Sequence, residues 1–223
     1  MASNFSNMRV AASIVTVLSA ITVASAAAAG PDLRLVIDRQ ETSIEVFAAL
    51  DADDSHGIFG TDASGLAAED GRIYYGAFRK TGTYDFASDL ISGVSMTVDG
   101  KTAELDAMSV MVHPDDLILP FVTPFDAVLA MSVCNVNDPD SPPTLDSLRL
   151  YSGFVAYPVE GWEAFSLNLP ATVPLEIEVT TYVDSANPQS TTYSVMPGEA
   201  LVFDEADRPG WFSSLSLAKL FSN

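Results

Sequence analysis

The chain has 223 residues, and its 30 Asp and Glu side chains outnumber 10 Lys and Arg, so the formal net charge is −20. This charge argues against nucleic acid and anionic membrane surfaces as partners, because both require clustered basic side chains. A composition that is 48% hydrophobic and only 18% charged is typical of a folded domain and argues against a disordered chain.

The first 26 residues have the pattern of a secretory signal peptide. Arg9 supplies a positive charge, an apolar stretch follows at 10–23, and Ala24-Ser25-Ala26 fits the small-residue site that a signal peptidase cuts. A permanent membrane anchor is the alternative, and we rank it second because the stretch ends in Ala and Ser with no Lys or Arg cluster behind it. We therefore expect residues 1–26 to be removed, with export to the periplasm or the extracellular space and no stable membrane insertion of the mature chain.

Residues 27–223 are then expected to form one β-rich globular domain. The β-branched and aliphatic runs at 33–37 and 43–47 predict the first two strands. The stretch 51–71 is rich in Asp, Ser, Gly and Ala, which predicts a long exposed loop. Strand-like sequence resumes at 72–78.

The strongest local signal in the chain predicts a β-hairpin. Residues 94–98 and 101–105 have strand character and flank Asp99-Gly100, the pair that a two-residue type I′ turn favours because both positions take a positive φ. Several prolines follow, and they argue against a long helix anywhere in 113–126.

The chain contains a single cysteine, so it forms no intramolecular disulfide. Cys134 closes the apolar run 127–134, where a free cysteine usually acts as a small buried hydrophobe. Further strands are predicted at 148–151 and 154–157, with the Ser-Gly pair between them as a candidate bulge.

The strictest alternation of apolar and polar residues lies at 173–183. One face carries aliphatic residues and the other carries Glu, Thr and Tyr, which predicts an antiparallel sheet covered on one side. A turn is expected at Asn187-Pro188, with the last strands at 191–195 and 200–203.

Short strands at intervals of roughly eight to twelve residues predict an all-β fold, a single antiparallel β-sandwich of jelly-roll or immunoglobulin-like type. A short C-terminal helix is predicted near the end, because Asp207 can cap it and Trp211, Leu215 and Ala218 recur at helical spacing. This C-terminal segment is apolar although the protein is strongly acidic. We therefore expect its apolar side chains to be buried, either against its own domain or against a partner.

The acidic loop suggests one metal hypothesis. Asp51, Asp53 and Asp62 fall at the first, third and twelfth ligand positions of an EF-hand loop, but His56 replaces the glycine that the sharp turn needs. A calcium site of another type, built from Asp51, Asp53 and Asp54, remains as the hypothesis, since hard oxygen ligands suit Ca²⁺. The competing explanation for the acidity is a solvated surface kept soluble by self-repulsion.

Motifs for nucleophilic catalysis or phosphate binding are absent from the sequence. His56 and His113 are the only histidines, and we interpret both as surface loop residues rather than as catalytic bases. These observations favour an exported, non-catalytic β-sandwich that binds a protein, a glycan or a surface assembly, with no cofactor other than the hypothetical calcium. The alternative is a secreted hydrolase with a carboxylate pair. The oligomeric state is left open.

Overall fold

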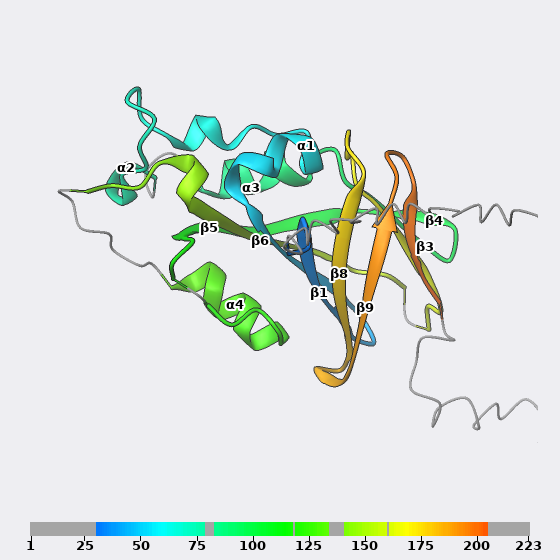
Figure 1. The fold of residues 1–223 in the computed structure, drawn as a ribbon. Coiled ribbons are helices and arrows are strands. Elements are labelled where there is room, and N and C mark those ends of the chain that lie inside the picture. Colours follow the sequence, from blue (N-terminus) through cyan, green and yellow to red (C-terminus); the bar gives the residue numbers. More distant parts are fainter. Residues whose placement is uncertain (1–29, 79–82, 118, 134–140, 160, 205–223) are drawn as a thin grey trace, which may run out of the picture. The chain divides into compact units, whose positions relative to one another are not determined.

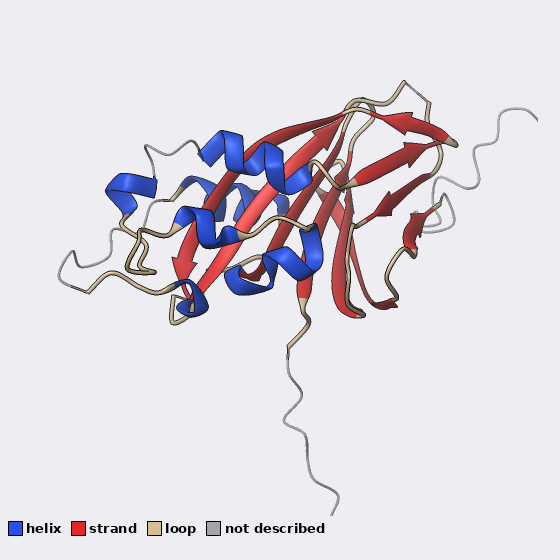
Figure 2. Cartoon of the chain, turned by 90° about the horizontal axis from the view of Figure 1, so that it is seen from above, coloured by secondary structure: helices blue, strands red, loops and turns tan. Residues whose placement is uncertain are grey.

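The structure is a computed structural model that describes residues 30–78, 83–117, 119–133, 141–159 and 161–204. From Pro31 onward, the described residues belong to one compact unit. They form two β-sheets and several short helices, which can be followed from two directions in Figures 1 and 2. The prediction of a β-rich fold is confirmed, and neither sheet closes into a barrel within the described residues.

The larger sheet has six strands in the order β5-β6-β2-β1-β8-β9. Their bounds are β1 (Leu33–Arg39), β2 (Ile44–Asp51), β5 (Leu105–Pro114), β6 (Leu148–Ala156), β8 (Leu175–Val183) and β9 (Ala186–Val195). Neighbouring strands are antiparallel except at the centre, where β1 and β8 run parallel. The sheet is therefore mixed, and the expectation of a purely antiparallel fold was wrong. Alternation along a single strand reports which face is buried and carries no information on the direction of the neighbour.

The smaller sheet has four antiparallel strands in the order β10-β7-β3-β4. Their bounds are β3 (Ser95–Val98), β4 (Lys101–Ala103), β7 (Phe165–Asn168) and β10 (Ala200–Phe203). The predicted hairpin is confirmed, because Val98 pairs with Lys101 and the two residues between them, Asp99 and Gly100, have φ values of 48° and 75°. A positive φ at both positions is the geometry for which Asp-Gly is suited.

The main core lies between one face of the large sheet, the small sheet and a set of short helices. These helices are η1 (Ala52–Asp54), α1 (Ser55–Phe59), η2 (Ala63–Leu66), α2 (Tyr75–Phe78) and α3 (Thr83–Ile91), with η3 (Leu145–Ser147) before β6. The prediction of a long exposed loop at 51–71 was wrong, because Ile58, Phe59 and Ala63 of this segment are buried in the core. The strand predicted at 72–78 is not observed. Arg72 forms an isolated β-bridge, and helix α2 begins three residues later.

A second, smaller core lies on the opposite face of the large sheet, under helix α4 (Pro124–Ser132). Figure 1 shows α4 on one side of this sheet and α1 to α3 on the other. The single-sided cover predicted for β8 holds along most of the strand, where Leu175, Ile177 and Val179 are buried in the main core. It fails at Tyr182, which is buried in the second core.

Two smaller expectations are also corrected. β6 is continuous through the Ser-Gly pair, and the register shift lies instead in β5, between Ala107 and Val110. The turn before β9 is formed by Asp184 and Ser185, which have positive φ values, so Pro188 lies inside the strand. β9 is the last strand of its sheet, where a proline is tolerated because no neighbour requires its missing N–H.

Three expectations fall outside the described residues: the signal peptide at 1–26, the environment of Cys134 and the helix predicted near 207–221. Within the described residues, no helix combines the length and the apolar character needed to cross a membrane.

Candidate functional site

Helix α4 begins with a well-defined capping arrangement. The Thr123 side chain accepts a hydrogen bond from the Asp126 amide (3.1 Å), and the Asp126 carboxylate accepts one from the Thr123 amide (3.0 Å). Pro124 occupies the first turn, where its missing N–H leaves no helical hydrogen bond unmade. The start of the helix is therefore specified by its own sequence.

Two polar contacts fasten α4 to the large sheet. The carbonyl of Ala130 lies 2.7 Å from Nε2 of the fully buried His113 on β5, so the imidazole donates to it. At the other end, the Tyr182 hydroxyl of β8 donates to the carbonyl of Val122 (3.0 Å). The buried face of the helix, which includes Ala127 and Met131, packs between these contacts against the second core.

A glycine in the sheet allows α4 to approach closely. A Cβ at Gly153 of β6 would lie 3.1 Å from Cδ1 of Phe47 and 3.2 Å from the sulfur atoms of Met108 and Met131. These distances are shorter than ordinary contacts, so any larger side chain would push the helix or its neighbours away. The position of α4 thus depends on the absence of a side chain in β6.

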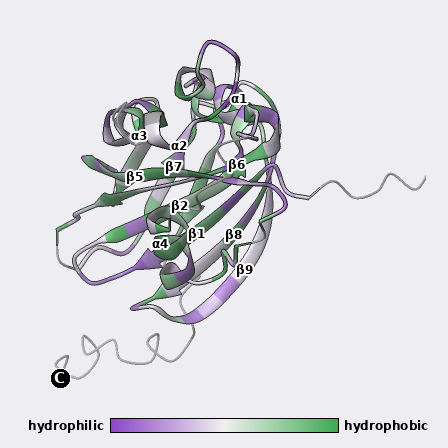
Figure 3. Ribbon diagram, turned by 90° about the vertical axis from the view of Figure 1, so that its left-hand side faces the viewer, coloured by the Kyte–Doolittle hydropathy of each residue, from purple (hydrophilic) through white to green (hydrophobic). Residues whose placement is uncertain are grey.

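The outward face of α4 is apolar as well. Five large side chains on it or at its ends are between 38% and 74% exposed, and we call them the α4 stripe: Val122, Phe125, Val128, Leu129 and Val133. The three within the helix recur at spacings of three and four residues, which places them on one side. Figure 3 colours α4 as largely hydrophobic. The stripe is the feature of the described surface that resembles a protein-binding site, because clustered exposed apolar side chains mark such surfaces.

This surface is not evident from the sequence. The apolar run 127–134 predicts buried side chains, and the prolines argue against a long helix in 113–126, yet α4 begins at Pro124. The combination of Thr123, Pro124 and Asp126 is a helix-start signal that could have revealed α4. Once a helix is assumed, Phe125 and Leu129 fall opposite the buried positions.

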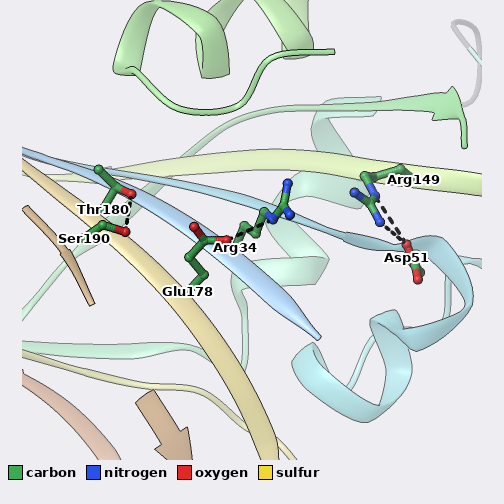
Figure 4. Close-up of polar contacts among 6 residues, drawn as sticks. All are labelled: Arg34, Asp51, Arg149, Glu178, Thr180 and Ser190. Atoms are coloured by element: carbon green, nitrogen blue, oxygen red, sulfur yellow. Dashed lines mark hydrogen bonds and ion pairs between the residues drawn. The ribbon is translucent and has the colours of Figure 1, made fainter. Parts of the chain in front are cut away.

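The three residues of the calcium hypothesis lie together at one end of the large sheet. Asp51 ends β2, and its carboxylate forms an ion pair with Arg149 of β6 at 2.9 Å, as Figure 4 shows. Asp53 and Asp54 follow in η1 and are exposed. No group of three or more acidic, His or Cys side chains with the geometry to hold a metal ion is found among the described residues.

Two aspartates of the acidic end of the sheet have raised pKa values. The pKa of Asp54 is raised, first by partial burial and then by repulsion from Asp53, Asp51 and Asp32. Burial and the charge of Asp51 also raise the pKa of Asp115. Negative charges held this close disfavour one another's ionised form, and a bound cation would relieve that repulsion.

A cavity of about 300 Å³ lies beside the β3–β4 hairpin. Its lining includes Glu104, Asp106, Tyr157 and Trp162. The Trp162 ring is 6% exposed and lies 5.3 Å from the guanidinium carbon of the buried Arg39, so this tryptophan is a core residue.

The histidines are not arranged for nucleophilic catalysis. His113 is buried rather than in a surface loop as expected, and burial lowers its pKa. Its ring donates to a backbone carbonyl and lies edge-on to Tyr151, at a centroid distance of 5.4 Å. His56 lies in α1. The structure thus assigns His113 to the attachment of α4.

Neither a scan of known protein-family models nor a search of curated proteins found a significant match to this chain.

Proposed function

We propose that this chain is an exported, non-catalytic β-sandwich that acts as a binding or structural accessory protein and docks another protein on the α4 stripe. The proposal rests on the observation that α4 is apolar on two sides. One side packs against the second core, and the other presents Phe125, Val128 and Leu129 to solvent. Export rests on the signal-peptide pattern of residues 1–26.

The chemistry of the stripe favours a protein over a glycan as the partner. Its five side chains carry no hydrogen-bond donor or acceptor, whereas sugar hydroxyl groups require such partners when they are desolvated. An uncharged apolar surface that includes an exposed phenylalanine, Phe125, instead suits the core of a protein interface, which is depleted of charged residues and enriched in aromatic ones. The two polar anchors at His113 and Tyr182 supply that rigidity.

Site-specific photo-crosslinking in the native host tests the proposal. A photoreactive amino acid at Val128 is expected to give a covalent adduct with another protein, and the same probe at the exposed Thr192 of β9 serves as the control. An adduct that forms at position 128 and not at position 192 supports docking at the stripe. Equal labelling at both positions, or no intermolecular adduct at position 128, contradicts the proposal.

The cavity beside β4 supports a second candidate function, a hydrolase with a carboxylate pair. Glu104 and Asp106 both line this cavity, together with the exposed Tyr157. Paired carboxylates beside an aromatic side chain are the components that a glycosidase needs. If this candidate is correct, the protein cleaves a glycoside, and both Glu104→Gln and Asp106→Asn lower the rate at least 100-fold while the thermal midpoint stays unchanged. Retained activity in both variants contradicts it.

A further inference from the structure

The α4 stripe raises the question of what covers it when no partner is bound. We infer that its resident occupant is the C-terminal segment of the same chain, residues 211–223, which folds back onto α4. This inference rests on the proposed docking role of the stripe and adds its regulation, because an outside partner would then have to displace the segment.

The chemistry of the segment matches the stripe. It contains six large apolar residues: Trp211, Phe212, Leu215, Leu217, Leu220 and Phe221. Its single charged side chain is that of Lys219, which is basic in a chain of net charge −20. The sequence predicts helical spacing for part of this segment, and two helices with apolar stripes can pack along each other. Lys219 would approach an acidic molecule from which most other segments are repelled.

The segment also starts close enough to reach α4. Asp204 is the last described residue, and its carbonyl accepts a hydrogen bond from Arg39 at the end of β1 (3.3 Å). The preceding residue, Asp38, pairs with Tyr182 of β8, whose hydroxyl donates to Val122 at the start of the stripe (3.0 Å). This series of contacts crosses the sheet near the end of its central strands, because Arg39 contacts Trp162 of the main core whereas Tyr182 lies in the second core. The segment must therefore pass around the end of β1 and β8 to reach the stripe.

The length of the chain beyond Asp204 is sufficient for this path. Standard bond lengths and strand spacing give about 30 Å for the series of contacts from Asp204 to Val122. Residues 205–223 number 19, and a fully extended chain of that length spans about 60 Å, which exceeds this separation. The residues nearest the C-terminus can therefore reach the stripe without any rearrangement of the sheet.

Covalent attachment favours the chain's own segment over that of a second copy. A short flexible connection holds a tethered group at an effective concentration in the millimolar range, well above the concentration of an exported protein in solution. The intramolecular contact therefore forms first, and exchange between copies would require a high protein concentration.

Thermal unfolding of four proteins tests this inference: the exported chain and a chain that ends after Gly210, each with and without Phe125→Ser. In the full-length chain, the substitution should lower the midpoint by several degrees, because Phe125 then contacts the segment. In the shortened chain it should have no effect, since the side chain is already 74% exposed. Tyr84→Ser is the matched control, because Tyr84 is an aromatic residue on α3 that is 59% exposed, and it should not distinguish the two lengths. An equal effect of Phe125→Ser at both lengths overturns the inference.

Photo-crosslinking of the purified full-length chain provides the second measurement and does not depend on the shortened chain folding. A probe at Val128 should form an adduct with a peptide from residues 211–223 of the same molecule. In a mixture of isotopically heavy and light protein, mixed heavy-light adducts indicate a second copy and overturn the inference, as does labelling of any other segment. An outside protein captured at position 128 in the host still supports docking at the stripe, so the two proposals can fail separately.

Discussion

Nε2 of His113 on β5 lies 2.7 Å from the carbonyl oxygen of Ala130 in α4. The contact joins the helix that carries the exposed stripe to the edge of the large sheet, and the imidazole is fully buried. Burial lowers the pKa of His113 and outweighs the hydrogen bond to Ala130, which raises it, so the folded chain favours the neutral ring.

The attachment of α4 should therefore be sensitive to acid. Because the folded-state pKa lies below the unfolded value of about 6.5, the unfolded chain binds the proton first, and stability declines as the pH falls through that value. Chemical denaturation at pH 7.5 and pH 5.5 measures the loss. His113→Gln can keep the donor and should remove this component of the pH dependence, whereas an unchanged slope would show that other groups cause it.

The acidic cluster gives a prediction of opposite sign. Asp54→Asn removes a carboxylate whose pKa is raised by burial and by neighbouring aspartates. The substitution should therefore increase the thermal midpoint at pH 7 without calcium, and the increase should be larger at low salt. If Asp51, Asp53 and Asp54 bind calcium, then calcium stabilises the wild-type chain at matched ionic strength, and the variant loses that response. Asp85→Asn, on the exposed surface of α3, is the control. Identical wild-type midpoints with calcium and with a chelator contradict the hypothesis.

Gly153→Ala should test the close approach of α4 to β6. The added methyl group would meet Phe47, Met108 and Met131 at 3.1 to 3.2 Å, so we expect a loss of about 1 to 3 kcal/mol in the free energy of unfolding. Gly65→Ala is the matched control, because a Cβ there meets nothing within 4 Å. Equal effects of the two substitutions would show that the spacing under α4 is not tight.

Export predicts a defined N-terminus for the mature protein. Mass spectrometry of the chain from its native host should show that it begins at Ala27, after removal of the segment ending at Ala26. A chain that retains Met1 in the membrane fraction would instead support the permanent anchor.

The sequence correctly predicted the elements whose geometry is determined by residues adjacent in the chain. The Asp99-Gly100 hairpin is one, since two adjacent positive φ values determine it. The segment 72–78 misled the prediction because Ile73, Tyr74 and Tyr75 have strand propensity. In the structure, the buried Ile73 precedes α2 and the buried Tyr75 begins it, and both side chains belong to the main core. Tertiary packing overrides local preference in such a segment.

The candidate site was less accessible to prediction than the fold. A helix that is apolar on two faces has no clear amphipathic pattern, so the run that contains α4 did not reveal which side chains point outward. The acidic residues near Asp51 were recognised from their spacing alone. The ion pair of Asp51 with Arg149 joins residues 98 positions apart in the chain, and only the sheet brings them together.

The parallel contact between β1 and β8 has a consequence for the order of events during synthesis. β1 lies at the centre of the large sheet, yet one of its two neighbours begins only at Leu175. A nascent chain that lacks this strand has one long edge of β1 unpaired, and contacts between such distant segments form slowly. The large sheet can therefore be completed only after most of the polypeptide has been synthesised. During export, such a chain would stay unfolded for most of its passage through a translocation channel.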